Sequence, residues 1–230
     1  MRKLLYFLIT FVGIFLIYMH FDKQKVNYMS IGDGLILGKN PYNMVSYGYN
    51  DFVKDYLNKN DRLSFFNVSF YNNKISGLLD DIKNNRTIWD NDKEYFIKKF
   101  LRESDMLVIS VGMEELFENY DKYNMDSNYV YFNKMYHDIE ELIHEIVKYA
   151  KGKIIFLGYY NPTSYYDSEV DEFFCYVDIK LNRLMMNNDI SYIDLYEKVK
   201  GKNYQDGINT PFLNAAGYRK ISESIEFYLE

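Results

Sequence analysis

The feature that most constrains this chain is a short apolar run that ends abruptly in a glycine-rich turn. Residues 26–31 (VNYMSI) have the composition of a β-strand, and Gly32-Asp33-Gly34-Leu35 then turns the backbone sharply. A strand that stops in such a turn ahead of a helix places its last residues at the carboxyl edge of a sheet. Because open α/β folds keep their ligand sites at that edge, we expect the functional site around residues 32–35.

Strand-like and helix-like segments alternate along the rest of the chain. Apolar runs predict further strands at 63–70, 105–111, 153–158 and 190–195. Apolar residues at three- and four-residue steps predict helices at 48–58, 75–82, 93–101, 127–150, 169–187 and 214–229. This alternation predicts an α/β fold: a three-layer α/β/α sandwich with a roughly five-stranded parallel sheet covered on both faces and right-handed crossovers.

The amino terminus has the pattern of a membrane anchor. Arg2 and Lys3 precede residues 4–21, an almost unbroken apolar stretch whose 18 residues would span about 27 Å as a helix, close to the bilayer core. Neither an Ala-x-Ala cleavage site nor a lipobox cysteine follows, so we expect an uncleaved, single-pass transmembrane signal anchor with linker at 1–25 and one domain at 26–230. The basic start favours a cytoplasmic amino terminus, which would place the domain outside the cytoplasm, at the cell membrane.

Charge and cysteine content argue against several classes of protein. The net charge is −6 and the chain has no basic stripe, so we expect no nucleic-acid partner. Cys175 is the only cysteine, which excludes an internal disulfide and a cysteine-based metal site.

Four segments match, in order, the motif blocks of one hydrolase family. They are Gly32–Leu35 (GDGL), 67–76 (NVSFYNNKIS), Gly112–Glu115 (GMEE) and 206–218 (DGINTPFLNAAGY). Together they resemble the blocks of the SGNH/GDSL hydrolases, the GDSL-like lipases and acylhydrolases, over nearly all of residues 26–230. The resemblance implies a flavodoxin-like α/β/α fold, ester hydrolysis as the family activity, and no cofactor or bound metal.

The resemblance also implies which residues would carry the chemistry, and most of them are changed. In the family a serine attacks an ester carbonyl, a histidine takes its proton, and an aspartate orients the histidine. The matching positions hold Gly34, Asn209 and Asp206, so only the aspartate is retained. The oxyanion-hole donors match Gly34, Asn72 and Glu114, and an ionised glutamate only accepts hydrogen bonds. We therefore expect a catalytically degenerate site.

Carboxylates would be one substitute for the lost triad. Asp33, Glu114, Glu115 and Asp206 would hold Mg²⁺ or Ca²⁺, or act as an acid/base pair, if all four met at the sheet edge. The interpretation we favour is that Asp33 and Asp206 cap turns and helix starts by accepting backbone N–H bonds.

Another hydroxyl would be the second substitute, but it needs a base to become a nucleophile. The hydroxyl residues near the matched blocks are Ser30, Ser69, Ser76 and Thr210. The histidines are His20 in the anchor and His137 and His144 on the long helix, where we expect both to be exposed and outside any site.

The leading hypothesis is a membrane-anchored, extracytoplasmic pseudoenzyme that binds or scaffolds acylated cell-envelope glycans or lipids. That ligand class rests on the family resemblance alone. The alternative is an active ester or acyl hydrolase, of lipase or esterase type, with a rearranged nucleophile or a carboxylate-bound metal. A third hypothesis is a purely structural component of an envelope assembly with no ligand in the cleft.

Overall fold

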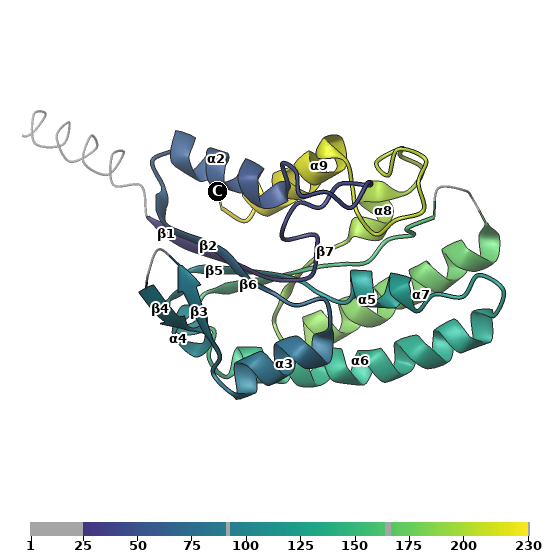
Figure 1. The fold of residues 1–230 in the computed structure, drawn as a ribbon, viewed down its shortest axis with the longest axis horizontal. Coiled ribbons are helices and arrows are strands. Elements are labelled where there is room, and N and C mark those ends of the chain that lie inside the picture. The colour runs from purple at the N-terminus through teal and green to yellow at the C-terminus, as the bar shows by residue number, and fades with distance from the viewer. Residues whose placement is uncertain (1–24, 91–92, 164–166, 230) are drawn as a thin grey trace, which may run out of the picture.

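A computed structural model describes residues 25–90, 93–163 and 167–229. These residues form three layers, with a five-stranded sheet between two layers of helices (Figure 1). The strands are β1 (Val26–Gly32), β2 (Leu63–Tyr71), β5 (Met106–Ser110), β6 (Lys153–Leu157) and β7 (Ser191–Ile193). They pair in parallel in the order β2-β1-β5-β6-β7, which is the flavodoxin-like order. The predicted α/β fold with a roughly five-stranded parallel sheet is confirmed.

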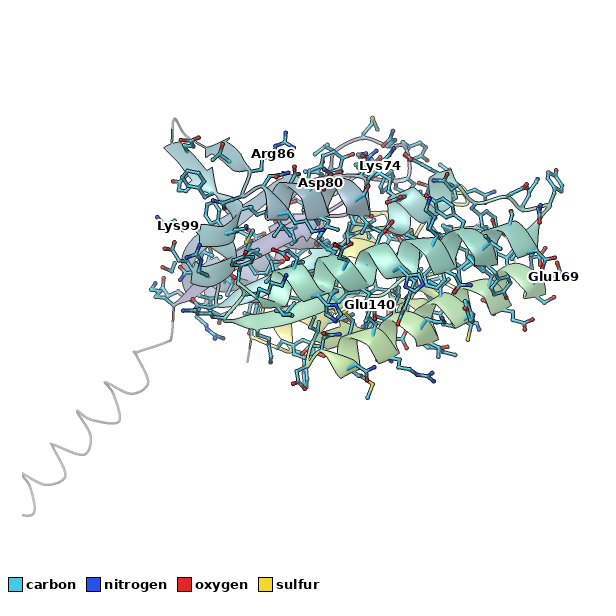
Figure 2. All side chains as sticks on the ribbon, turned by 90° about the horizontal axis from the view of Figure 1, so that it is seen from below. Lys74, Asp80, Arg86, Lys99, Glu140 and Glu169 are labelled. Carbon is cyan, nitrogen blue, oxygen red and sulfur yellow. The ribbon has the colours of Figure 1, made fainter. Side chains whose placement is uncertain are left out.

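Helices cover both faces of the sheet. On one face α2 (Tyr49–Lys59) packs against α9 (Ala215–Glu226), and α8 (Leu195–Val199) lies beside them. On the other face α6 (Met125–Val147) packs between α3 (Ile75–Lys83) and α7 (Ser168–Asn187). Figure 2 looks onto this second layer, where Asp80, Glu140 and Glu169 come from three different helices. The outer surface of the layer therefore carries charge, as expected of amphipathic helices on a buried sheet.

The core follows from the apolar patterns of these elements. Every residue of β5 is buried, because a central parallel strand is covered by helices on both faces. The apolar stripe of α6 is buried in the way its spacing predicts, and includes Phe132, Met135, Ile139, Leu142 and Ile146.

The prediction of a single helix at 93–101 is wrong. Residues Lys93–Phe96 form strand β4, which pairs antiparallel with β3 (Thr87–Asp90), and helix α4 (Ile97–Glu103) begins only afterwards. The helical spacing of apolar residues at 95, 96, 97 and 100 also fits a strand followed by a helix. The antiparallel pairing with Thr87–Asp90 decides between the two, and the Tyr95 ring then packs on Phe100 of α4 with 4.9 Å between ring centroids.

The predicted transmembrane helix at 4–21 lies outside the described residues. Within residues 25–90, 93–163 and 167–229, no helix combines the length and apolar content needed to cross a bilayer.

Candidate active-site locus

The neighbouring strands β1 and β5 end side by side at the switch point of the sheet. The chain leaves β1 toward α2 on one face, and leaves β5 through α5 (Met113–Glu118) toward α6 on the other (Figure 1). Divergent connections from adjacent parallel strands open a crevice outside their carboxyl ends, where such folds bind ligands. The segments 32–35 and 112–115, which match two of the family's motif blocks, meet there.

Asp33 joins these two segments from a fully buried position. Its Oδ1 accepts the Leu35 N–H at 3.2 Å, and its Oδ2 accepts the Glu114 N–H at 3.1 Å. Asp33 therefore caps the turn after β1 and the start of α5, in keeping with the interpretation we favoured from the sequence.

The pKa of Asp33 is raised from its ordinary value near 3.8 to about 7. Burial is the main cause and the charge of Glu114 adds to it, whereas the hydrogen bonds from the Glu114 and Leu35 amides lower the pKa and offset part of the rise. Because the folded state holds this proton up to a higher pH than the unfolded chain does, the contribution of Asp33 to stability falls as pH rises from about 4 to about 7. We expect Asp33→Asn to remove that fall, so that the melting temperature of the variant relative to wild type rises across this window.

Melting curves of the two proteins at several pH values between 4 and 8 check this expectation. The variant is also expected to melt at a temperature lower by a constant amount at every pH, because an asparagine side chain has one acceptor oxygen for the two backbone N–H groups that Asp33 satisfies. Profiles that stay parallel from pH 4 to 8 would contradict the assignment of the pH dependence to Asp33.

Glu114 occupies the position from which the family resemblance would call for an amide donor. Its Oε2 accepts the N–H of Gly34 at 2.9 Å, and its Oε1 lies 2.8 Å from the Lys39 Nζ. Burial lowers the pKa of Lys39, but the hydrogen bond and charge of Glu114 outweigh it and hold that pKa above its ordinary value. A nearly buried ion pair thus covers the Gly34 amide.

The space beside Gly34 is also filled. A Cβ on Gly34 would lie 2.6 Å from Lys39 Cδ, 2.7 Å from Phe212 Cε1 and 3.0 Å from Glu114 Oε2. The Lys39 ammonium lies 5.0 Å from the Phe212 ring centroid and 5.4 Å from that of Tyr71, within the range of cation–π attraction. A side chain at position 34 would therefore displace at least one member of this cluster.

Asn72 uses its backbone amide elsewhere. The Asn72 N–H donates to the carbonyl of Gly32 at 2.8 Å and so extends the pairing of β2 with β1. Its side chain accepts the Lys74 N–H at 3.0 Å and donates to Asp81 at 3.2 Å. The role of Asn72 as an oxyanion donor stays a prediction, and in this structure its N–H is engaged within the sheet.

The fourth motif block begins in the loop before α9, where residues 206, 207 and 209 are exposed, and runs through buried residues into the first turn of that helix. Asp206 is exposed, adopts a positive φ of 55°, and accepts a hydrogen bond from the Asn214 side chain at 2.6 Å. Asn214 in turn caps α9 by accepting the Gly217 N–H at 3.1 Å. Asn209 is exposed on the same loop. The retained aspartate thus helps to order the entry into α9.

The four candidate carboxylates do not converge on one point. Asp33 and Glu114 are neighbours, but Glu115 accepts the Ile75 N–H at the start of α3 at 2.8 Å and the Tyr131 hydroxyl at 3.2 Å. Asp206 is bound to Asn214 on its exposed loop. Among the described residues, no group of three or more His, Cys, Asp or Glu side chains is arranged to hold a metal ion.

The candidate hydroxyls do not lie next to the candidate histidines in the described part of the structure. The Ser30 hydroxyl is fully buried 2.8 Å from that of Tyr49, and the buried Thr210 hydroxyl accepts the Phe212 N–H at 3.3 Å. Ser76 is exposed, and the side chain of Ser69 is outside the described part of the structure.

Both described histidines, His137 and His144, are exposed on α6, as predicted. No hydrogen bond in the described part of the chain joins either one to a serine or threonine hydroxyl.

Three buried tyrosines hold the site loops together. Tyr159 donates to the carbonyl of Val111 at 2.6 Å, Tyr160 to that of Pro211, and Tyr218 to that of Lys39. Each hydroxyl links one of the loops that carries a motif block to another element. Tyr218 is the last residue of the fourth motif block, and Tyr159 and Tyr160 directly follow the strand predicted at 153–158, so their positions could be read from the sequence whereas their hydrogen bonds could not.

Comparison with solved structures identifies the fold. A lipase from a goat rumen metagenome superposes with a TM-score of 0.71 at 18% identity, over 90% of this chain and 100% of the lipase. An acetylxylan esterase from Geobacillus stearothermophilus superposes with a TM-score of 0.62 at 16% identity, over 90% of this chain and 94% of the esterase. No protein-family model and no curated protein matches the sequence. At these identities the likeness shows the fold, which is that of the SGNH/GDSL hydrolases.

Proposed function

We propose that this chain is an SGNH/GDSL-fold protein that does not hydrolyse esters and instead binds or scaffolds acylated glycans or lipids of the cell envelope. Residues 1–25 would anchor it in the membrane with the domain outside the cytoplasm. The observation that carries the proposal is the Glu114 carboxylate, which accepts the Gly34 N–H and contacts the space where a side chain at position 34 would project.

This arrangement opposes acyl transfer at two steps. Stabilising an oxyanion requires donors aimed at the position where negative charge develops. Here the Gly34 N–H points at a carboxylate and the Asn72 N–H points at a carbonyl. A substrate oxyanion would have to displace Glu114, which already carries negative charge and is paired with Lys39.

The residues at the nucleophile and base positions also cannot support ester hydrolysis. Gly34 has no oxygen, and the amide of Asn209 takes up no proton at neutral pH. In a serine protease, loss of the nucleophile or the base lowers the rate about 10⁶-fold, and loss of one oxyanion donor about 10²- to 10³-fold. These losses are not additive, yet each alone would leave little turnover.

The ligand class is supported by two observations. Solved structures with this fold include a lipase and an acetylxylan esterase, whose names indicate a lipid and an acetylated glycan as substrates of those proteins. In addition, β1 runs from Val26 to Gly32, which places the site about 20 Å from the point where the described chain begins. With an anchor on residues 1–25, the site would face away from the bilayer, which favours glycans.

We expect the purified full chain, in a mild detergent, to hydrolyse p-nitrophenyl acetate and p-nitrophenyl butyrate no faster than buffer does. An active esterase assayed in the same detergent is the positive control. Ester turnover above background would refute the proposal. If that turnover disappeared with a chelator or with Asp206→Ala, it would favour a hydrolase that uses carboxylates.

Ligand binding separates the proposal from a purely structural role. Acetylated oligosaccharides are expected to raise the melting temperature of the full chain in a concentration-dependent way, because a ligand that binds only the folded state stabilises it. No rise with any acetylated oligosaccharide or short-chain lipid would favour the structural role.

A further inference from the structure

A cavity lies along the same edge of the sheet as Gly34 and Glu114, but further along it. It has a volume of about 390 Å³, within the range of small-molecule sites of about 300–1,000 Å³. Its walls come from Asn161 and Thr163 after β6, from the first turn of α7, from α8, and from the loop 200–207 that leads toward α9. The cavity therefore lies at the carboxyl ends of β6 and β7, whereas Gly34 and Glu114 lie at those of β1 and β5.

One loop separates the cavity from the site formed by Gly34, Glu114 and Lys39, which we call the Gly34 locus. Gln205 lines the cavity, is almost fully buried, and donates from its Nε2 to the carbonyl of Asn161 at 3.1 Å and to that of Thr210 at 3.5 Å. Two residues after Thr210, the Phe212 ring lies against Gly34. The 205–212 loop is thus a common wall, held on the cavity side by a buried amide.

The cavity presents uncharged donors and acceptors to a ligand. The Asn161 Oδ1 already accepts the Thr163 N–H and hydroxyl at 2.9 and 2.6 Å. Within the described residues, the Asn161 side-chain NH₂ donates no hydrogen bond and the Gln205 side-chain carbonyl accepts none. Asn203 adds a third amide to the lining. A hydroxyl both donates and accepts, so a polyhydroxylated ligand suits this set.

The charges of the cavity are largely paired with each other. The Lys200 Nζ lies 3.0 Å from the Asp171 carboxylate and 2.8 Å from the Tyr196 hydroxyl. The first N–H groups of α7 are taken by its cap residue Asp167, so the helix start offers them to no anion. The lining is therefore less suited to a phosphate or sulfate than to a neutral ligand, with Lys202 exposed at the rim.

We infer that this cavity is a saccharide subsite that holds one sugar unit of an oligosaccharide through the side chains of Asn161, Asn203 and Gln205 and the Tyr196 hydroxyl. The inference rests on the proposed function, because it names the glycan part of the ligand class and gives it a place next to the blocked Gly34 locus. The sugar is recognised by its hydroxyl groups, and its acyl groups are not needed for binding here.

The test is titration of the full chain in detergent with xylotetraose and with the tetramer of N-acetylglucosamine, followed by calorimetry. Saturable binding of at least one is expected, and Asn203→Ala and Tyr196→Phe are each expected to weaken it about five- to tenfold through loss of a neutral hydrogen-bonding group. Asn187→Ala, at the exposed end of α7, is the matched control and is expected to leave affinity unchanged.

Several outcomes would overturn the subsite. They are no binding of either tetramer at concentrations on the order of 10 mM, affinity that neither cavity variant changes, or binding of sodium sulfate or phosphate in place of the sugars. Sugar binding that is weakened by Phe212→Ala but by neither cavity variant would refute the subsite and leave the proposed function standing. Sugar binding that is weakened by the cavity variants, in a protein that also hydrolyses esters, would support the subsite and refute the proposed function.

Discussion

Replacing Glu114 with alanine is expected to lower the free energy of unfolding by about 2–4 kcal/mol. The substitution leaves the Lys39 ammonium without its carboxylate and the Gly34 N–H without its acceptor. Both groups are poorly hydrated, because the side chains of Lys39 and Glu114 are only 16% and 9% exposed. Removing one partner of such a pair costs more than the pair contributes, since a buried charge remains. Urea denaturation of the full chain measures the loss.

Two further variants isolate the cause. Glu118→Ala removes a carboxylate from the exposed side of the same helix and is expected to change stability by less than about 0.5 kcal/mol. Lys39→Met in the Glu114→Ala background is expected to restore part of the loss, because it removes the unpaired charge and places an apolar side chain near the rings of Tyr71 and Phe212. Equal stabilities of Glu114→Ala and Glu118→Ala would refute the buried pair.

The same variant tests the functional argument. Glu114→Ala uncovers the Gly34 N–H and removes the negative charge that would repel an oxyanion. We nevertheless expect no ester hydrolysis, since position 34 still lacks an attacking oxygen. Glu114 is therefore expected to affect stability strongly and ester turnover not at all.

The layered fold could be predicted from the sequence because its strands are buried on both faces. The run at 105–111 is apolar enough to be assigned as a strand without knowledge of its neighbours, and β5 is Met106–Ser110. The β3–β4 hairpin could not be predicted in this way. Residues 93–96 carry a helix-compatible pattern, and only pairing with Thr87–Asp90 makes them a strand.

The site could be predicted in position but not in its contacts. The turn after β1 marks the switch point of the sheet, and the match at Gly112–Glu115 places Glu114 nearby. That Glu114 is neutralised by Lys39, 75 residues away, depends on a loop between β1 and α2 whose conformation has no sequence signature. The engagement of the Asn72 N–H by Gly32 likewise follows from strand register, which composition does not specify.

Gly32→Ala is expected to be more damaging than Glu114→Ala, with a loss of about 3–5 kcal/mol in the free energy of unfolding or no folded protein recovered. Gly32 has a φ of 143°, which side chains rarely adopt, and a Cβ there would lie 1.6 Å from the carbonyl oxygen of Ser110. That oxygen also accepts the Asp33 N–H at 2.7 Å, so it cannot withdraw without opening the turn. The close approach of β1 to β5 at this point brings Asp33 within reach of the Glu114 amide.

The matched control is Gly207→Ala. Gly207 also has a positive φ, of 75°, but a Cβ there would have no heavy atom within 4 Å, so only backbone strain of roughly 1–2 kcal/mol is expected. The difference between the two variants measures the steric part of the Gly32 requirement. If Gly32→Ala melted within a few degrees of Gly207→Ala, the contact with Ser110 would not constrain the turn, and the capping of α5 by Asp33 would need another cause.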